Sequence, residues 1–335
     1  MPHSPSRRDA VRGLEGTRVG RYVLEDCLGH GDHTAVYRAW TPSGEWYALK
    51  LVGTRVQGAE NLAERLRRDA AILDSGGHPH ILPISNPMRS DDMTAAAMPL
   101  MAAPTLRDLM GGDGLDPESA WTILSQVADT LEAAHQQGLT YKVLKPANIL
   151  VSGGQAYLSE FGITGRHAGQ LGLATPGCQL PTPQYLAPEQ VLGQEPDHRS
   201  DIYAFAVLVF ELATATSLAD GAAPAAVLAR TLQDPPPSAA GLSALVPADV
   251  DGVLRRALAR DPRARPGSVG ELMEELVCPP SPAVPAAAAA PAESGDAAAR
   301  FAEVVPAAPG DDVSVESLID VLSGVLAPEA ELADG

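Results

Sequence analysis

Two short stretches of this chain have residue types and spacings that bear on phosphate chemistry. Residues 28–37 read LGHGDHTAVY, and Gly29 and Gly31 let backbone amides approach a phosphate closely. Thr34 makes this loop bulkier, and we expect it to weaken the cradle without abolishing it. Residues 140–150 read TYKVLKPANIL, and Val143 at their centre can accept neither a proton nor a hydrogen bond. The first stretch is compatible with phosphate binding, whereas the second offers no general base at its centre.

Further motifs follow these two in a recognisable order. YALK at residues 47–50, EFG at 160–162, LAPEQ at 186–190 and DHRSDIY at 197–203 lie in sequence, with Arg265 beyond them. Each motif alone is weak, but the ordered set over residues 20 to 277 resembles the bacterial, actinobacterial-type Ser/Thr protein kinase family. The chain is similar to that family as a degenerate member.

The resemblance assigns roles within residues 140–150. The family reads His-Arg-Asp, then any residue, then Lys-Pro-x-Asn, and its aspartate accepts the proton of the substrate hydroxyl. Here Tyr141, Lys142 and Val143 stand for the first three residues, whereas Lys145 and Asn148 match. The catalytic set is therefore not intact, because valine occupies the position of the base.

The resemblance also implies an altered metal site. Glu160 stands where the family has the aspartate that chelates Mg²⁺, and Asn148 is the second metal ligand. The additional methylene of Glu160 moves the carboxylate oxygens, whereas magnesium requires near-ideal octahedral geometry. We expect the binding of ATP and Mg²⁺ to be weakened or absent.

The resemblance implies a nucleotide pocket around Lys50, which in the family holds the α- and β-phosphates. Asp69 takes the position of the ion-pairing glutamate, and it either pairs with Lys50 through a closer helix or is a solvated helix residue. Pro99 lacks an amide but keeps the carbonyl that adenine would meet. The implied nucleotide-binding residues are Leu28, Gly29, Gly31, Val36, Ala48, Lys50, Met98, Pro99, Met101, Lys145, Asn148 and Leu150.

Residues with structural roles in the family are retained. Glu189 is expected to be buried against Arg265, and Asp201 is expected to bond to the backbone of residues 140–150. Residues 117–135 carry apolar side chains at helical spacing after an Asp-Pro cap. His135 on that face is interpreted as a core or rim histidine. The substitutions thus fall on chemical positions, whereas the positions that hold the fold are kept.

The composition excludes several classes of protein. The chain has 335 residues and a net charge of −18, which argues against nucleic acid and against an anionic lipid surface as partners. Cys27, Cys178 and Cys278 lack metal-ligand spacing and are interpreted as free thiols in a reducing compartment. We see no signal peptide, and the longest apolar run, residues 202–212, is too short to span a bilayer. A cytoplasmic location is predicted.

The predicted fold class is α+β, with an antiparallel β-sheet N-lobe and a mainly helical C-lobe. We expect a flexible arm at residues 1–18, the N-lobe at 19–101 and the C-lobe at 102–277. An Ala/Pro-rich linker at 278–311 and an acidic tail at 312–335 follow. The tail has apolar residues at helical spacing, so it is either a short amphipathic helix that docks on a partner or on the domain, or a fraying helix without a partner.

Two functions remain after this reading. The first is a pseudokinase, a regulatory or binding module that retains ATP binding or has lost it. A protein partner would recognise the conformation of this module. The partner is an active kinase, a substrate or a regulator. The second is a weakly active Ser/Thr protein kinase, because phosphoryl transfer depends largely on positioning and electrostatics. Whether the chain is an enzyme depends on Val143.

Overall fold

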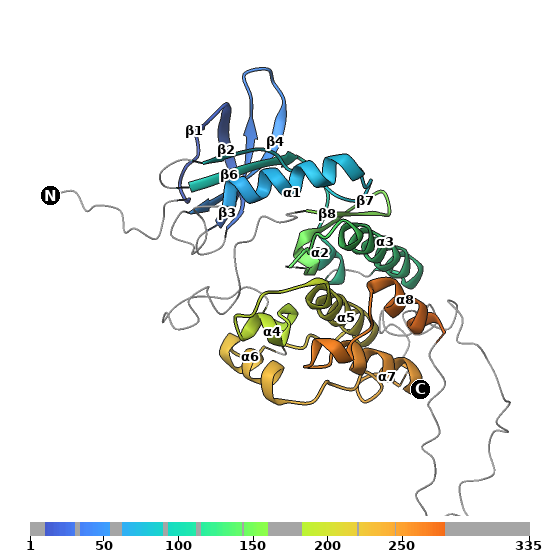
Figure 1. Ribbon diagram of the computed structural model, residues 1–335. Helices are drawn as coiled ribbons and strands as arrows, with labels where there is room; N and C mark the ends of the chain where they lie inside the picture. Colours follow the sequence, from blue (N-terminus) through green and yellow to red (C-terminus); the bar gives the residue numbers. More distant parts are fainter. Residues whose placement is uncertain are drawn as a thin grey trace, which may run out of the picture.

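A computed structural model describes the chain over residues 11–30, 34–53, 62–89, 93–111, 115–142, 144–159, 183–219, 221–244 and 246–278. Within these ranges a β-sheet lies at one end and a group of helices at the other (Figure 1). The predicted linker beyond Cys278 and the acidic tail lie outside the described residues, as do Gly31, Val143 and Glu160.

The N-terminal lobe is a six-stranded antiparallel sheet in the order β1-β2-β3-β4-β6-β5. Apolar and polar residues alternate along β3, so that Ala35, Tyr37 and Ala39 are buried on one face. The strands are β1 (Arg18–Val19), β2 (Tyr22–His30), β3 (Thr34–Trp40), β4 (Trp46–Gly53), β5 (Ser85–Arg89) and β6 (Met93–Pro99).

The segment before the sheet corrects the predicted arm, which was expected to extend to residue 18. Val11 is 1% exposed and packs in the same apolar cluster as Tyr37. The Tyr37 hydroxyl donates a 3.1 Å hydrogen bond to the Val11 carbonyl. Residues 11–19 therefore belong to the lobe. The sequence pattern did not predict this, because Val11 and Leu14 are too few to produce a periodic pattern, although both pack in the cluster that contains the buried Tyr37.

The C-terminal lobe is built around α5 (His198–Thr214), in which every residue from Ser200 to Thr214 is buried. Its neighbours are α2 (Leu106–Met110), α3 (Pro117–Gln136), α4 (Pro188–Val191), α6 (Pro224–Gln233), α7 (Ala248–Ala257) and α8 (Val269–Val277). As predicted, Asp116 caps α3, and its carboxylate accepts a 2.9 Å bond from the Ser119 amide. Among the described residues, no helix is long and apolar enough to cross a membrane.

The two lobes meet through α1, a hairpin and two isolated bridges. Helix α1 (Leu62–Gly76) packs on β5 and β6, and its Leu66 and Ala70 join the large core that continues into the helices. The hairpin of β7 (Ile149–Ser152) and β8 (Gln155–Leu158) bridges to Ile81 and Thr105. The predicted α+β, two-lobed fold is confirmed, and the loop at 140–150 precedes the hairpin beneath the sheet.

Candidate functional site

One face of the sheet brings together residues that the sequence placed at a nucleotide site. Val36 lies opposite Lys50, which lies opposite Ala96, and Ala48 lies opposite Met98 two residues along. Directly paired residues share a face, as do residues two apart in one strand. Val36, Ala48, Lys50 and Met98 therefore point to the same side of the sheet.

This side of the sheet is the one that meets α1 and the helical lobe. Met98 is buried in the large core with residues of α1, whereas Ala35, Leu49 and Ala97 on the other face belong to the separate core of the N-terminal lobe. Lys50 is 5% exposed, which is unusual for a lysine. Asp69 is half-buried in α1, and its ion pair with Lys50 stays a prediction.

The remaining nucleotide-site residues lie at the margins of this face or in the hairpin below it. Leu28 is exposed near the end of β2, Pro99 is exposed at the end of β6, and Met101 is half-buried after it. Leu150 lies in β7, where it bridges to Thr105. The structure therefore distributes the predicted residues over both lobes.

The backbone of the loop is anchored by Asp201 of α5, as predicted. The carboxylate accepts a 2.7 Å bond from the Tyr141 amide and a 2.6 Å bond from the Lys142 amide. His135 Nε2 lies 2.9 Å from the same carboxylate. Asp201 is 1% exposed, so these bonds form in an environment with little water, where they stabilise the loop most.

Lys142 is held in an uncommon backbone conformation directly before Val143. Its φ is +74°, in the left-handed region that residues with a Cβ seldom adopt. The Gln190 side chain donates a 2.9 Å bond to the Lys142 carbonyl, and Asp201 accepts from its amide. Lys142 Nζ lies 3.9 Å from Glu195 Oε1 on the surface. The backbone of the loop of residues 140–150 is thus held at both the amide and the carbonyl of Lys142.

Ser159 joins this loop to the segment that leads to Glu160. The Ser159 amide and hydroxyl each donate a 3.0 Å bond to the Asn148 carbonyl. The Tyr141 hydroxyl donates to the Ser159 carbonyl. Asn148 is itself buried, at 4% exposure. The chain therefore brings Asn148 next to the residue that precedes Glu160, so the two predicted metal ligands come from adjoining segments.

Glu189 and Arg265 form the predicted buried ion pair. Two guanidinium nitrogens of Arg265 lie 2.7 and 2.8 Å from the two carboxylate oxygens of Glu189, in a bidentate arrangement. Ser200 donates a further 2.7 Å bond to Glu189. Burial alone would raise the pKa of Glu189, but the bonds and charge of Arg265 outweigh it and lower the pKa below its ordinary value.

Three contacts at this site were not predicted from the sequence. His135 was interpreted as a core or rim histidine, and it contacts the Asp201 carboxylate. Gln190 and Ser159 had no assigned role, although both fix the backbone of the loop. Of these three, only Gln190 could have been found from the sequence, through its place in the LAPEQ motif. The partners of the other two polar side chains become visible only once the chain is folded.

Comparison with known proteins identifies the family. The model of the protein kinase domain matches residues 22–278. The serine/threonine-protein kinase PknD of Mycobacterium tuberculosis is 34% identical over 268 residues, which cover 79% of this chain and 40% of that protein. PknH of Mycobacterium bovis is 31% identical over 267 residues, which cover 79% of this chain and 45% of that protein. The chain thus spans less than half the length of these relatives.

A solved structure leads to the same family. The crystal structure of the Mycobacterium tuberculosis PknI kinase domain superimposes with a TM-score of 0.60 at 27% identity. The superposition covers 78% of this chain and 97% of that domain. The two-lobed fold, the Asp201 anchor, the Glu189–Arg265 pair and these matches agree, and the chain belongs to the protein kinase family, with bacterial Ser/Thr kinases among its relatives.

Proposed function

We propose that this chain is a pseudokinase: a kinase-family domain that acts as a regulatory or binding module without efficient phosphoryl transfer. The observation that carries the proposal is a contrast at the loop of residues 140–150. Asp201 and Gln190 hold the backbone of Tyr141 and Lys142, so the frame of the loop is intact. The next residue is Val143, which has no atom that can accept a proton.

The proposal includes a large loss of rate. A general base contributes typically 10²–10⁴-fold to a reaction. Glu160 in place of the aspartate adds a metal ligand of altered length, although losses within one site do not simply add. Because active kinases turn over at about 1–100 s⁻¹, we expect transfer by this chain to be slower by at least two orders of magnitude.

Residual nucleotide binding belongs to the same proposal. Lys50 and Asn148 are both buried, on the sheet face and in the loop frame, and Lys145 is half-buried between them in sequence. These residues suit ATP, with Lys50 toward its phosphates and Asn148 with Glu160 toward Mg²⁺, which would neutralise charge on the phosphates. ATP binding without phosphoryl transfer would bias the conformation of the domain, and a protein partner would recognise that conformation.

A weakly active Ser/Thr kinase is the second candidate, and the burial of Lys50 favours it. A buried cation is costly to retain, and its retention is compatible with a nucleotide that is still positioned for transfer. Such an enzyme would transfer the γ-phosphate of ATP to protein Ser or Thr by positioning and electrostatics without a base.

A transfer assay with radiolabelled ATP distinguishes these candidates. We expect the native chain to give no more transfer than Lys50→Ala, its matched background control. The double variant Val143→Asp/Glu160→Asp restores both carboxylates, and we expect it to gain at least tenfold over the native chain. Transfer by the native chain that disappears in Lys50→Ala would refute the pseudokinase and support the second candidate.

Nucleotide binding is measured separately, by the thermal stability of the native chain with ATP and Mg²⁺. A ligand at one hundred times its dissociation constant stabilises a protein by about 2.7 kcal/mol. We expect a smaller shift in Lys50→Ala than in the native chain. Equal shifts in both would show that ATP does not use the predicted pocket.

A further inference from the structure

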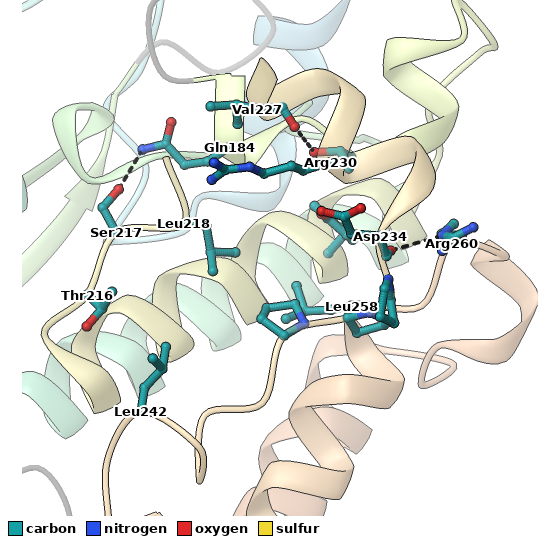
Figure 2. A pocket seen from close by; sticks show the side chains of 15 residues that line it. Gln184, Thr216, Ser217, Leu218, Val227, Arg230, Asp234, Leu242, Leu258 and Arg260 are labelled. Carbon is teal, nitrogen blue, oxygen red and sulfur yellow. Dashed lines mark hydrogen bonds between the residues drawn. The ribbon is translucent and has the colours of Figure 1, made fainter. Parts of the chain in front are cut away.

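A pocket in the helical lobe lies apart from every predicted nucleotide-binding residue. It has a volume of about 310 Å³ and is bordered by α5, α6, the end of α7 and the segment that follows α6 (Figure 2). Its walls are largely apolar, with Leu218, Val227, Pro236, Leu242 and Leu258. A volume of this order is enough for the apolar side chains of a short peptide segment.

The pocket contains a buried polar atom that lacks a hydrogen bond. Gln184 is 6% exposed and lies in η4 (Pro183–Tyr185). Its amide nitrogen donates a weak 3.5 Å bond to the Ser217 hydroxyl (Figure 2). Its oxygen Oε1 is buried and has no hydrogen-bond partner among the described residues. Oε1 is covered by protein atoms, so an occupant of the pocket that donates a hydrogen bond would reach it only after the Gln184 amide turns, and pairing this buried acceptor would favour that turn.

Two further features define the chemistry of the occupant. Leu242 lines the pocket and is 55% exposed, so it offers apolar surface to an occupant. Arg230, Arg260 and Asp234 also line the pocket, so its charged side chains leave an excess of one positive charge. Arg260 is held in place by bonds of 2.6 and 3.2 Å to the carbonyls of Gln233 and Asp234. An occupant with leucine-like anchors, a hydroxyl or amide donor and negative charge fits these three features.

The chain itself contains a segment of this composition beyond the described residues. Residues 313–326 read VSVESLIDVLSGVL, which combines apolar anchors, serine hydroxyls and two acids. Leu318 and Ile319 lie between Glu316 and Asp320 and follow Ser317. Residues 1–10 and residues 279–291 fit less well, because the former contain two arginines and the latter are almost entirely alanine and proline.

The connection between the domain and this segment is long enough. About 35 residues lead from Cys278 to residue 313, and a chain of that length spans at most about 115–125 Å when fully extended. A domain of about 250 residues has a radius of gyration of roughly 18 Å, so the segment reaches its surface without strain. Linkage also raises the effective concentration toward the millimolar range, so weak contacts suffice.

We propose that residues 313–326 dock in cis into the pocket bordered by α5, α6 and α7, with Leu318 and Ile319 against Leu242 and a serine hydroxyl on Gln184. The docked segment would contact Tyr203, which lines the pocket and lies under the Arg265 guanidinium at 5.0 Å. The acidic tail is thereby connected with the Glu189–Arg265 pair.

Hydrogen exchange measured by mass spectrometry on the full chain tests this proposal. At an effective concentration of about 1 mM and a dissociation constant of about 0.1 mM, docking slows exchange in residues 313–326 roughly tenfold. We expect Leu242→Asp to abolish the protection. Leu192→Asp is the matched control, since Leu192 is 61% exposed and does not line the pocket, and we expect it to keep the protection.

A variant in the segment itself keeps the test independent of changes in the domain. Ile319→Asp should remove the protection, and a labelled peptide of residues 311–328 should then bind this variant more tightly than it binds the native chain. Protection that is absent in the native chain, that survives Leu242→Asp, or that rises with protein concentration would overturn docking in cis. The last of these results would instead indicate a second copy as the source of the segment.

Discussion

Replacing Asp201 with alanine removes the carboxylate that fixes the loop of residues 140–150. The side chain is 1% exposed and accepts bonds of 2.7 and 2.6 Å from the amides of Tyr141 and Lys142. It also lies 2.9 Å from His135 Nε2. The variant leaves two backbone donors in a protein interior without their acceptor, and the left-handed conformation of Lys142 loses one of its two supports.

The magnitude follows from these three contacts. Hydrogen bonds to a charged group contribute about 1.5–3 kcal/mol each, but three bonds to one carboxylate are strongly coupled and do not add. We therefore expect Asp201→Ala to lower the free energy of unfolding by about 3–5 kcal/mol. For a domain of this size each kcal/mol lowers the melting temperature by about 2–4 °C, which gives a decrease of roughly 6–20 °C.

Urea denaturation of the full chain measures the loss, with Asp197→Ala as the control. Asp197 caps the same helix through a 2.8 Å bond from the Arg199 amide, but it is exposed. Loss of such a cap costs about 1 kcal/mol. If Asp201→Ala and Asp197→Ala destabilise the protein equally, the buried carboxylate does not anchor the loop, and the reasoning is wrong.

The remaining predictions concern buried or strained positions in the helical lobe. Arg265→Met leaves the Glu189 carboxylate buried without its partner, and we expect calorimetry to show a loss of about 3–5 kcal/mol, which the double variant with Glu189→Gln should partly recover. The pKa of Glu189 in the folded chain lies below the ordinary 4.5, so the ionised carboxylate stabilises the folded state above pH 4.5, and this stabilisation is lost as the pH falls toward the lowered value. The urea midpoint of Glu189→Gln should therefore decrease less steeply with acid than that of the native chain. Ala215 ends α5 at a φ of +49°, so Ala215→Gly should raise the free energy of unfolding by about 0.5–1 kcal/mol, and an unchanged urea midpoint would contradict the strain at this residue.

The order of motifs along the sequence was sufficient to predict the fold and its long-range supports. Glu189 and Arg265 are far apart in sequence, yet their pairing was expected because both belong to one recognised set of motifs, and the structure confirms it. The same holds for Asp201 and the backbone of the loop. These predictions succeeded because each involves a residue whose type is fixed by a single geometric role in the family.

Other features became visible only in the folded chain. Ser159 and Gln190 bond to the loop and His135 bonds to its anchor Asp201, and these contacts depend on how three separate segments pack. The pocket beside Gln184 is formed by residues 184 to 260, whose spacing shows no pattern. A sequence records which side chains are present and their local periodicity, and it determined here that Val143 lacks a proton acceptor. Cavities, unpaired buried atoms and the supports of a loop depend on distances between segments, and only the packing of the two lobes sets those distances.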